Sequence, residues 1–435
     1  MMAVHRPARL AVLATVTLAL TGCVEALPFA QPVSRSAFSP QDPALATPAR
    51  KGSAVIDDLR ARQSVLPAGG TYAAIADAVL ANASGASEAE LRMARLQAEA
   101  QAKNWLPRIG PQISLTSLGT VLAEIVVDQA LFDHGRRKAE RDHAAADVEV
   151  AAVALVSDLN ARVHDGIVAW IDAEQARAQA GVAERASARL AEYERIVAIR
   201  VEGGLSDRSE HQIITQTRTE MQATLHADQQ IIARSLAELS LLTGGRVPQG
   251  AGADALPADA GGAQPLSVLA ARAQGARMLA EADMARAGLL PGLNAQVGLD
   301  QDGEVTPGLT LGGATFGAGM GARRQALDAT PDLVNRRNAE AVAEADRRIS
   351  ALTGEIAALQ SRQQQGEAVL RQTLSNLDLF SEQYRLGGRS LVDLVGQFDA
   401  AARLERDQVS VGYEIARLQV AIARERGVLI DGARL

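Results

Sequence analysis

The side chains best placed to do chemistry lie in one short stretch, YRLGGRSLVD, which spans residues 384–393. Tyr384, Arg389 and Asp393 offer a phenol, a guanidinium and a carboxylate, spaced 0, 5 and 9 along the chain. Such groups can act through charge-assisted hydrogen bonds to other parts of the chain. Arg389 and Asp393 are also four residues apart, so a local ion pair worth a few tenths of a kcal/mol is an alternative.

Two glycines interrupt a long helical pattern at this point. Gly387 and Gly388 in a helix interior cost about 2 kcal/mol relative to alanine, at about 1 kcal/mol each. Because glycine adopts positive φ without strain, the pair predicts a chain reversal. Ser390 is then expected to cap the returning helix, with Asp393 near its positively polarised start, and capping alone is an alternative account of both residues. The same pattern occurs earlier in the chain, at Gly203, Gly204, Leu205 and Ser206, where Ser206 is expected to cap the returning helix of the first unit.

Other patterns that could carry chemistry are incomplete. The glycine-dense stretch 312–321 lacks both the GK[ST] ending of a phosphate loop and the GxGxxG spacing. His134, His143, His164 and His211 do not have the spacing of a metal site such as HExxH. The net charge of −7 disfavours a nucleic-acid partner, which requires a clustered basic surface. We therefore expect neither an enzyme nor a bound cofactor.

The N-terminus has the pattern of an exported lipoprotein. Residues 1–22 combine a basic start, an apolar segment of 11 residues and the letters LTG, which together predict a secretory signal peptide. Cys23, the only cysteine, follows, and LTGC resembles the lipobox of bacterial lipoproteins, in which this cysteine is lipidated. By the same resemblance, Val24 implies sorting to the outer membrane. An ordinary signal peptide with a chance cysteine is the alternative, and residues 23–70 are expected to form a lipid-anchored, proline-rich tether.

An internal duplication decides the expected fold. WLPRIGPQISL at 105–115 matches LLPGLNAQVGL at 289–299, with Pro107 and Pro291 separated by 184 positions (291 − 107 = 184). GGLS at 203–206 meets GGRS at 387–390 at the same separation (387 − 203 = 184). One separation shared by features so far apart predicts two copies of one structural unit, residues 71–244 and 266–435, joined by a glycine-, proline- and alanine-rich linker at 245–265.

Each unit is expected to contain the same elements in the same order. Residues 71–104 have helical composition, whereas 107–117 and 121–132 alternate with period two and predict a β-hairpin. A helix of roughly 100 Å is expected from Gly135 to about Val201, with an apolar stripe suited to a partner helix. A further helix should follow the glycines, over 206–242. The fold class is therefore mainly α with a small β part, built from duplicated long coiled-coil helices and hairpins.

The predicted strands have about the length that a tilted membrane-spanning strand needs. Four strands in one chain cannot close a barrel, and lipid does not tolerate open sheet edges, so several chains would have to share one barrel. With its duplicated hairpins and glycine turns, the chain resembles the TolC family of outer membrane channels over residues 71 to about 430. That resemblance implies a homotrimer whose twelve strands form a barrel, continued by a periplasmic α-helical tunnel. It also implies an exit duct of a tripartite efflux or type I secretion system, in contact with outer membrane lipid, a periplasmic adaptor and an inner-membrane ABC or RND pump.

The resemblance assigns roles to the glycine-turn residues as well. Tyr384 and Arg389 would belong to the links that hold the periplasmic entrance closed, and three copies of Asp393 would line it. The turns would form the periplasmic tips and dock the adaptor, through Gly203, Gly204, Leu205, Ser206, Gly387, Gly388 and Ser390. Two positions depart from the family pattern. Ser209 stands where an acidic partner for the arginine is common, so that Asp207 or Glu210 would have to replace it, and Gly396 stands where the family has a second acidic residue.

Two other function classes are alternatives, a periplasmic adaptor or structural lipoprotein on the one hand and an enzyme on the other. A periplasmic adaptor or a structural coiled-coil lipoprotein would also have long helices and a lipid anchor. Adaptors, however, have one helical hairpin flanked by β-rich domains, and duplicated period-two hairpins do not fit that plan. An enzyme is disfavoured because the sequence offers no nucleophile, metal or phosphate-loop constellation.

Overall fold

The computed structural model describes residues 53–115, 121–250, 252–257, 262–300, 302–312 and 317–434, which belong to one unit of mutual contacts, Gly52–Leu435. Cys23, the predicted signal peptide and the proline-rich part of the predicted tether lie outside the described residues. None of the helices in the described ranges combines the length and the apolar character needed to cross a membrane.

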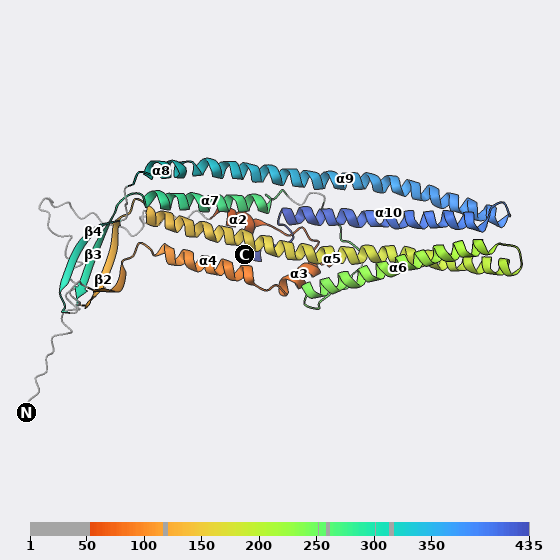
Figure 1. Cartoon of the computed structure of the whole chain (residues 1–435), viewed down its shortest axis with the longest axis horizontal. Helices are drawn as coiled ribbons and strands as arrows, with labels where there is room; N and C mark the ends of the chain where they lie inside the picture. Colours follow the sequence, from red (N-terminus) through yellow and green to blue (C-terminus); the bar gives the residue numbers. More distant parts are fainter. Residues whose placement is uncertain are drawn as a thin grey trace, which may run out of the picture. The chain divides into compact units, whose positions relative to one another are not determined.

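Both predicted hairpins are present and join into one sheet. Its four antiparallel strands are β1 (Arg108–Leu115), β2 (Val121–Phe132), β3 (Gly292–Asp300) and β4 (Val305–Gly312), in the order β1-β2-β3-β4. The two hairpins, far apart in the sequence, meet through the pairing of β2 with β3 (Figure 1). Within the described chain β1 and β4 each have a neighbour on one side only, so both outer edges of the sheet are unpaired.

The first half continues from the hairpin into long helices. Before the sheet come α3 (Thr71–Ala81) and α4 (Ala86–Ala102), separated at Gly85, which has φ of 67°. After the sheet, α5 (Arg136–Glu202) runs for 67 residues, roughly 100 Å at 1.5 Å per residue. The chain then turns into α6 (Arg208–Leu242), which packs along α5. The predicted long helix and the predicted returning helix are confirmed to within two residues.

The second half has the same order of elements with one interruption. Its helices are α7 (Leu266–Ala287), α8 (Met320–Asp328), α9 (Thr330–Arg385) and α10 (Leu391–Glu425), followed by a short 3₁₀ helix, η2 (Gly432–Arg434). Pro331 lies in the first turn of α9, where a missing N–H costs nothing. The same proline cannot donate to a carbonyl one turn earlier, which accounts for the break between α8 and α9.

The number of residues between equivalent positions of the two halves changes from 184 to 183 within the stretch that contains α8 and α9. Helices α5 and α8 begin 184 positions apart (320 − 136 = 184), as the strands do. Helices α6 and α10 begin 183 positions apart (391 − 208 = 183) and end 183 positions apart (425 − 242 = 183). The prediction that equivalent positions are 184 residues apart throughout is therefore wrong for the turns and for helices α6 and α10. The second half has one residue fewer between the start of α8 and the end of α9, and the break at Ala329 falls in that stretch.

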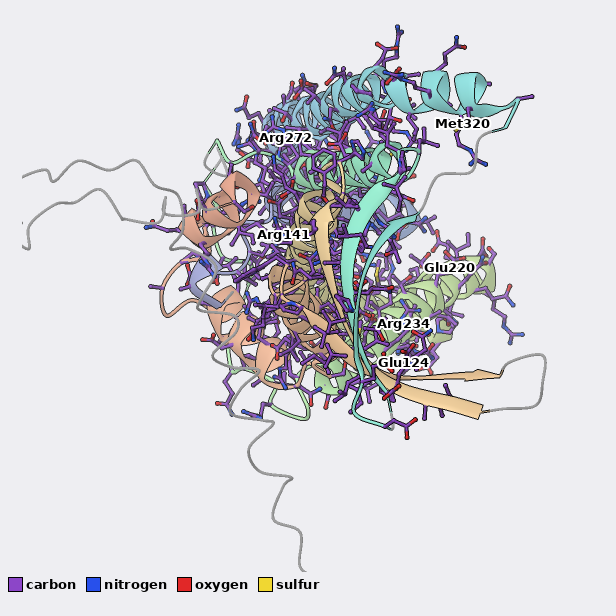
Figure 2. All side chains as sticks on the ribbon, turned by 90° about the vertical axis from the view of Figure 1, so that its left-hand side faces the viewer. Glu124, Arg141, Glu220, Arg234, Arg272 and Met320 are labelled. Carbon is purple, nitrogen blue, oxygen red and sulfur yellow. The ribbon has the colours of Figure 1, made fainter. Side chains whose placement is uncertain are left out.

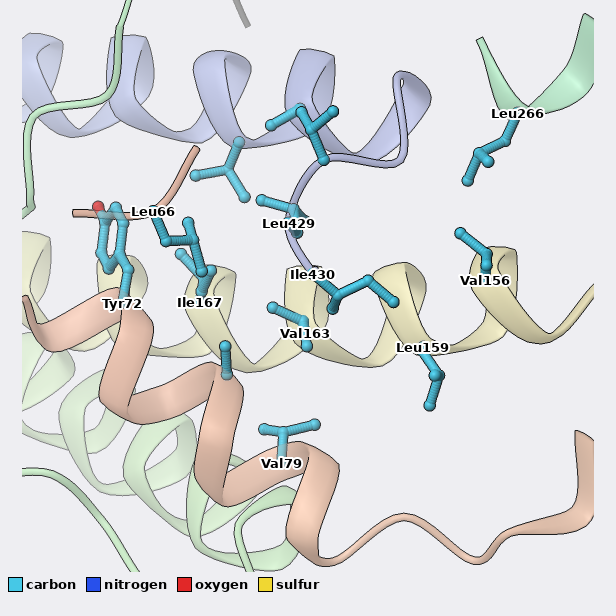
Figure 3. Packing of buried hydrophobic residues seen from close by; sticks show 14 of the residues in the cluster. Leu66, Tyr72, Val79, Val156, Leu159, Val163, Ile167, Leu266, Leu429 and Ile430 are labelled. Carbon is cyan, nitrogen blue, oxygen red and sulfur yellow. The ribbon is translucent and has the colours of Figure 1, made fainter. Parts of the chain in front are cut away.

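A large core forms where α5 meets α3 and the C-terminal segment. The predicted apolar stripe of α5 supplies Leu159, Val163 and Ile167, which pack against Tyr72 and Val79 of α3 (Figure 3). On the other side of α5 the same residues meet the chain that follows α10, at Leu429 and Ile430. Gly166 allows the close approach of α3, because a Cβ there would lie 2.9 Å from Val79 Cγ2 and 3.1 Å from Ile75 Cγ2.

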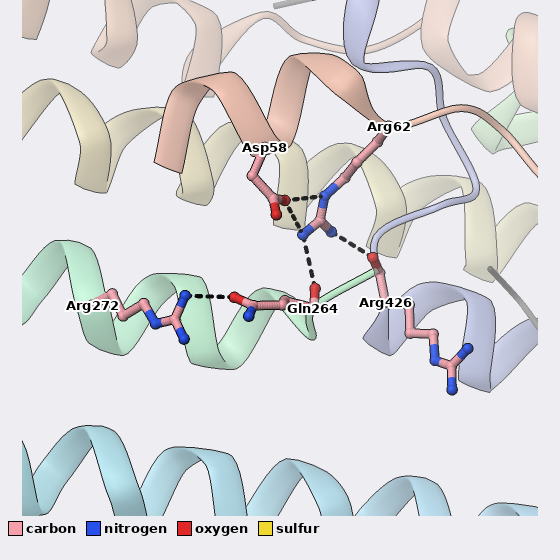
Figure 4. Close-up of polar contacts among 5 residues, drawn as sticks. All are labelled: Asp58, Arg62, Gln264, Arg272 and Arg426. Carbon is pink, nitrogen blue, oxygen red and sulfur yellow. Dashed lines mark hydrogen bonds and ion pairs between the residues drawn. The ribbon is translucent and has the colours of Figure 1, made fainter. Parts of the chain in front are cut away.

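Residues 53–70 form part of this core, so the tether prediction is wrong for that stretch. Helix α2 (Ala54–Ala61) buries Val55 and Leu59. Beyond it, Arg62 is only 6% exposed and donates to the side chain of Asp58 and to the carbonyl oxygens of Gln264 and Arg426 (Figure 4). The tether prediction rested on the prolines before residue 50 and overlooked the apolar spacing of Val55 and Leu59, which lie four residues apart on one helix face.

A second, smaller core lies toward the turns at the far ends of the long helices. Leu190, Tyr193 and Val197 of α5 pack there with residues of α6 and α10, among them Ile214 and Leu394. Helix α9 contributes little to either core, since Val334 and Ala345 are its only buried residues. Charged side chains such as Glu220, Arg234 and Arg272 cover the outer sides of the helices, as the view from the sheet end shows (Figure 2).

Candidate functional site

The two glycine turns end the long helices in the same way. In the first turn Gly204 has φ of 69°, and the N–H groups of Gly204 and Leu205 donate to the carbonyls of Val201 and Arg200. In the second turn Gly387 has φ of 78°, and Gly387 and Gly388 donate to Tyr384 and Gln383. Each is a Schellman motif, in which a left-handed residue closes the helix and satisfies its last carbonyls. The predicted reversal with positive φ is confirmed.

The two turns use different members of the glycine pairs. The left-handed residue is the second glycine in the first turn, Gly204, and the first glycine in the second turn, Gly387. Gly203 is the C-cap residue of α5, with φ of −80°. The turns therefore correspond at the separation of 183, and the predicted match of Gly203 with Gly387 is one residue out of structural register.

The same shift decides which residues cap the returning helices. Ser390 caps α10, as predicted, through a capping box: its Oγ accepts from Asp393 N at 3.1 Å, and Asp393 Oδ2 accepts from Ser390 N at 3.4 Å. Ser206 does not cap α6. The N-cap position is taken by Asp207, whose side chain makes no capping hydrogen bond. The sequence prediction for Ser206 is wrong because it assumed the separation of 184.

Tyr384 connects the two halves of the chain. Its hydroxyl oxygen accepts a hydrogen bond from Arg200 Nη1 at 3.2 Å, and the Arg200 guanidinium lies 5.9 Å from the centre of the tyrosine ring. This contact joins α9 to α5 near both turns. Arg200 is not among the residues predicted for this site, although its place one turn before a helix-ending glycine pair could have suggested it.

Arg389 bonds within its own hairpin. Its Nε donates to Gln383 Oε1 at 3.1 Å, and its guanidinium lies 4.5 Å from the centre of the Phe380 ring. The alternative of an Arg389–Asp393 ion pair is not what the structure shows, because the Asp393 carboxylate bonds to the backbone of Ser390 instead. Arg389 therefore lies against the end of α9, with Asp393 at the start of α10.

The two turns enclose an open hollow of about 720 Å³. Its lining brings two cations, Arg200 and Arg389, close to three carboxylates, Asp207, Glu210 and Asp393. Opposite charges gathered in one open hollow attract each other, which favours holding the two turns close together.

Two leucines project from the turns. Leu205 is 74% exposed and Leu386 is 78% exposed. Leu205 was predicted as a tip residue, whereas Leu386 was missed because it lies one residue before the glycine pair. Exposed leucines at the ends of two adjacent hairpins offer an apolar contact for a partner.

The two departures from the family pattern are both accessible. Ser209 is exposed on α6, while the neighbouring Glu210 lines the hollow. Gly396 is exposed on α10, and a Cβ added there would meet no atom within 4 Å. The first turn thus presents its carboxylates at Asp207 and Glu210, the two positions considered as replacements for Ser209.

At the end of the long helices opposite the turns, the sheet separates polar from apolar side chains. Cross-strand partners such as Ile109 with Val127, and Ile125 with Leu299, share one face and are apolar. The opposite face carries polar residues, which include Arg108, Gln112, Glu124, Asp128, Asn294, Gln296, Asp300 and Thr310. A sheet with one apolar face and one polar face, joined to long helices, fits a boundary between lipid and water.

No group of three or more histidine, cysteine, aspartate or glutamate side chains in the described ranges could hold a metal ion. The charged residues of the turns take part in capping, helix contacts and the shared hollow.

Comparisons with known proteins support the fold. The sequence matches no family model and no curated protein. In structure, the chain is similar to a membrane protein from Pseudomonas aeruginosa, with a TM-score of 0.72 and 16% identity over 84% of this chain and 96% of that one. It is similar to the outer membrane protein VceC from Vibrio cholerae, with a TM-score of 0.72 and 15% identity over 82% and 96% of the two chains. It is also similar to the open state of the MtrE outer membrane channel of Neisseria gonorrhoeae, with a TM-score of 0.64 and 16% identity over 87% and 89%.

These similarities extend over the strands and the helices together, because each covers more than four fifths of both chains. The four-stranded sheet, the long helices and the paired turns occur in the order that the sequence resemblance implied. The chain therefore has the fold of the TolC-like outer membrane channels.

Proposed function

We propose that this protein is the outer membrane exit duct of a tripartite efflux or type I secretion system. The observation that carries the proposal is the likeness of nearly the whole chain to solved outer membrane channels, VceC and MtrE among them. In this role the protein passes substrates from an inner-membrane pump and its adaptor to the exterior. It is a passive conduit, so it needs no cofactor and performs no reaction.

The sheet supports a barrel shared between copies. Both edges of the four-stranded sheet are unpaired in one chain, and lipid does not tolerate such edges. Pairing β4 of one copy with β1 of the next removes both edges, and three copies give a closed barrel of twelve strands. The exposed length of α9, with only two buried residues, is then covered by a neighbouring copy in a helical tunnel.

The turns supply the periplasmic end of the duct in this proposal. Tyr384 and Arg389 hold neighbouring helices together, and three copies of Asp393 line the entrance, where they favour cations. The turn residues dock the periplasmic adaptor, with the exposed Leu205 and Leu386 as apolar contacts. Lipid on Cys23 adds a second attachment to the outer membrane.

Disulfide cross-linking at the strand edges tests the shared barrel. We would place one cysteine in β1, at Gln112, and one in β4, at Thr306 or Thr310, in a Cys23→Ser background. Two strands separate β1 from β4 within a chain, at about 4.8 Å per strand, so a disulfide must join different copies. Covalently linked trimers are expected for one β4 position. In the matched control the first cysteine is placed at Gln296 of the interior strand β3 instead of at Gln112. Linked trimers in that control would contradict the shared barrel, and so would the absence of linked trimers from every edge variant.

A further inference from the structure

Two exposed aromatic side chains lie at one border of the sheet. Trp105 precedes β1 and Phe132 ends β2, so the antiparallel pairing of these strands places both where the sheet meets the helices. Trp105 is 60% exposed and Phe132 is 58% exposed. Every other aromatic side chain in the described ranges is buried or half-buried. The exposed aromatic residues of the described chain are thus confined to this border.

A β-bulge directs Phe132 to the apolar face. Along β2, Asp128 and Ala130 face the polar side with Gln296 and Asn294 as partners. Strict alternation would turn Phe132 to the polar side too. The register instead shifts between Ala130 and Phe132, so that Phe132 lies opposite Leu293, whose partner on β4 is Leu311. Bulges re-aim side chains in this way, and here the bulge completes an apolar row across the foot of three strands.

A glutamine marks the same level on the apolar face. Gln129 is the only polar residue among the positions that share this face in the four strands. Its Nε2 donates to the carbonyl oxygens of Trp105, at 3.0 Å, and Ala130, at 3.1 Å. The amide donors are therefore satisfied within the chain, and the backbone of Trp105 is held beside the apolar face.

Basic side chains lie close to the apolar row of Phe132, Leu293 and Leu311, on the side of the sheet where the helices begin. Lys103 is two residues before Trp105, and Arg136 is four residues after Phe132. Both side chains are exposed, and within the described part of the chain they form ion pairs with acidic residues of their own helices, Glu99 and Glu140. An apolar face, then aromatic rings, then exposed cations is the order in which a protein meets acyl chains, the headgroup boundary and lipid phosphates.

We propose that Trp105 and Phe132 bind at the boundary between phospholipid headgroups and acyl chains, on the side of the membrane where the helices begin. This contact sets the depth of the sheet in the bilayer. Indole suits the boundary because it combines a large apolar ring with an N–H donor. The proposal rests on the exit-duct function, which requires the sheet to lie in the membrane, and it adds which residues set the depth.

The two tryptophans of the sequence make the proposal measurable. Trp170 is 2% exposed and donates from Nε1 to the carbonyl of Gly252 at 2.9 Å, so it serves as an internal control. The full-length protein and its Trp105→Phe variant would be placed in vesicles of phosphatidylethanolamine and phosphatidylglycerol. The vesicles would contain phosphatidylcholine with a nitroxide either near the headgroup or near the end of an acyl chain.

The difference between the two proteins isolates the fluorescence of Trp105. We expect the shallow nitroxide to quench that fluorescence at least about twofold more than the deep one. The Trp105→Phe variant should be quenched weakly by both, and adding Phe132→Trp to it should restore shallow quenching. The proposal is overturned if Trp105 is quenched no more than Trp170 is, or more by the deep label than by the shallow one.

A third position separates this inference from the proposed function. Ile113 lies within β1 on the apolar face and is exposed, so Ile113→Trp in the Trp105→Phe background reports on the strand itself. Strong lipid quenching at residue 113 without quenching at Trp105 would leave the sheet in the membrane and overturn the interfacial contact alone. Absence of quenching at both positions would overturn the contact and the exit-duct function together.

Discussion

At the scale of single residues, Arg62 shows how one buried cation joins three segments that are distant in the sequence. Its guanidinium reaches Asp58 of α2, the carbonyl of Gln264 just before α7 and the carbonyl of Arg426 at the end of α10 (Figure 4). The last contact also places a positive charge at a helix C-terminus, where the helix dipole favours it. The N-terminal segment, the start of the second half and the C-terminus are thus held at one point.

Removing this guanidinium should destabilise the fold. We expect Arg62→Ala to lower the free energy of unfolding by about 3 kcal/mol or more, since it leaves two carbonyls and a carboxylate without their donor. The measurement is unfolding of the helices in detergent, followed by circular dichroism. Arg60→Ala is the matched control, because Arg60 is exposed on the same helix and its loss should change stability by less than about 0.5 kcal/mol. Equal stability of the two variants would contradict the role of Arg62.

The residues at the turns lead to a prediction about current through the duct. Tyr384→Phe removes the acceptor for Arg200, and Arg389→Ser removes the contacts with Gln383 and Phe380. If these contacts hold the entrance closed, the double variant should raise single-channel conductance several-fold. Asp393→Asn should lower the preference for cations while keeping an acceptor for the capping box.

Tyr193→Phe provides a control for the loss of a tyrosine hydroxyl. Tyr193 also accepts from an arginine at 3.2 Å, but that arginine, Arg189, belongs to the same helix, so no contact between helices is lost. Its conductance should match that of the unchanged protein. Conductance and selectivity unaltered in the double variant and in Asp393→Asn would show that these residues only end and cap helices.

At the scale of elements, the long helices and strands could be predicted because their patterns are strong and local. The stretches that alternate with period two predicted the strands β1 to β4, and the apolar stripe predicted which face of α5 is buried. The missing residue in the second long helix could not be predicted, because the matching GG pairs conceal it. Helix α2 was missed because it follows a proline-rich stretch, and its burial depends on Arg62 contacts with distant segments.

The shift in separation has a direct test at the turns. Gly204 and Gly387 have positive φ, whereas Gly203 and Gly388 do not. Valine at either of the first two should cost about 2 kcal/mol or more, because β-branched residues are strained in the left-handed region. Valine at Gly203 or Gly388 should cost less than half as much. Thermal unfolding of the four variants measures this, and a pattern in which Gly203 and Gly387 are the sensitive pair would support the separation of 184 instead.

At the scale of the whole molecule, the proposed duct would have two independent attachments to the outer membrane, the sheet and the predicted lipid anchor. In the proposed duct the apolar face of the sheet would contact lipid along several strands, whereas Cys23 would carry acyl chains at the start of the mature protein. The single cysteine of the sequence makes the anchor simple to test. The proposed pairing of β1 with β4 depends on a neighbouring chain. The open edges of a four-stranded sheet predict that several copies share one barrel, whereas the number three came only from the family resemblance.

Labelling with a radioactive fatty acid tests the anchor. We expect label in the unchanged protein and none in Cys23→Ala, because that variant lacks the only thiol available for lipid. Sorting to the outer membrane should weaken more than folding, since the sheet supplies its own contact with lipid. Equal labelling of the two proteins would show that Cys23 is not the site.

Planar bilayer recording decides whether this protein forms a conducting exit duct. The full-length protein, purified in detergent as trimers, would be added to a bilayer beside the Tyr384→Phe/Arg389→Ser variant and beside a heat-unfolded sample. We expect uniform single-channel steps that are small for the unchanged protein and larger for the variant, with none from the unfolded sample. If folded trimers of both proteins insert and neither conducts more than the unfolded sample, the protein is not an exit duct.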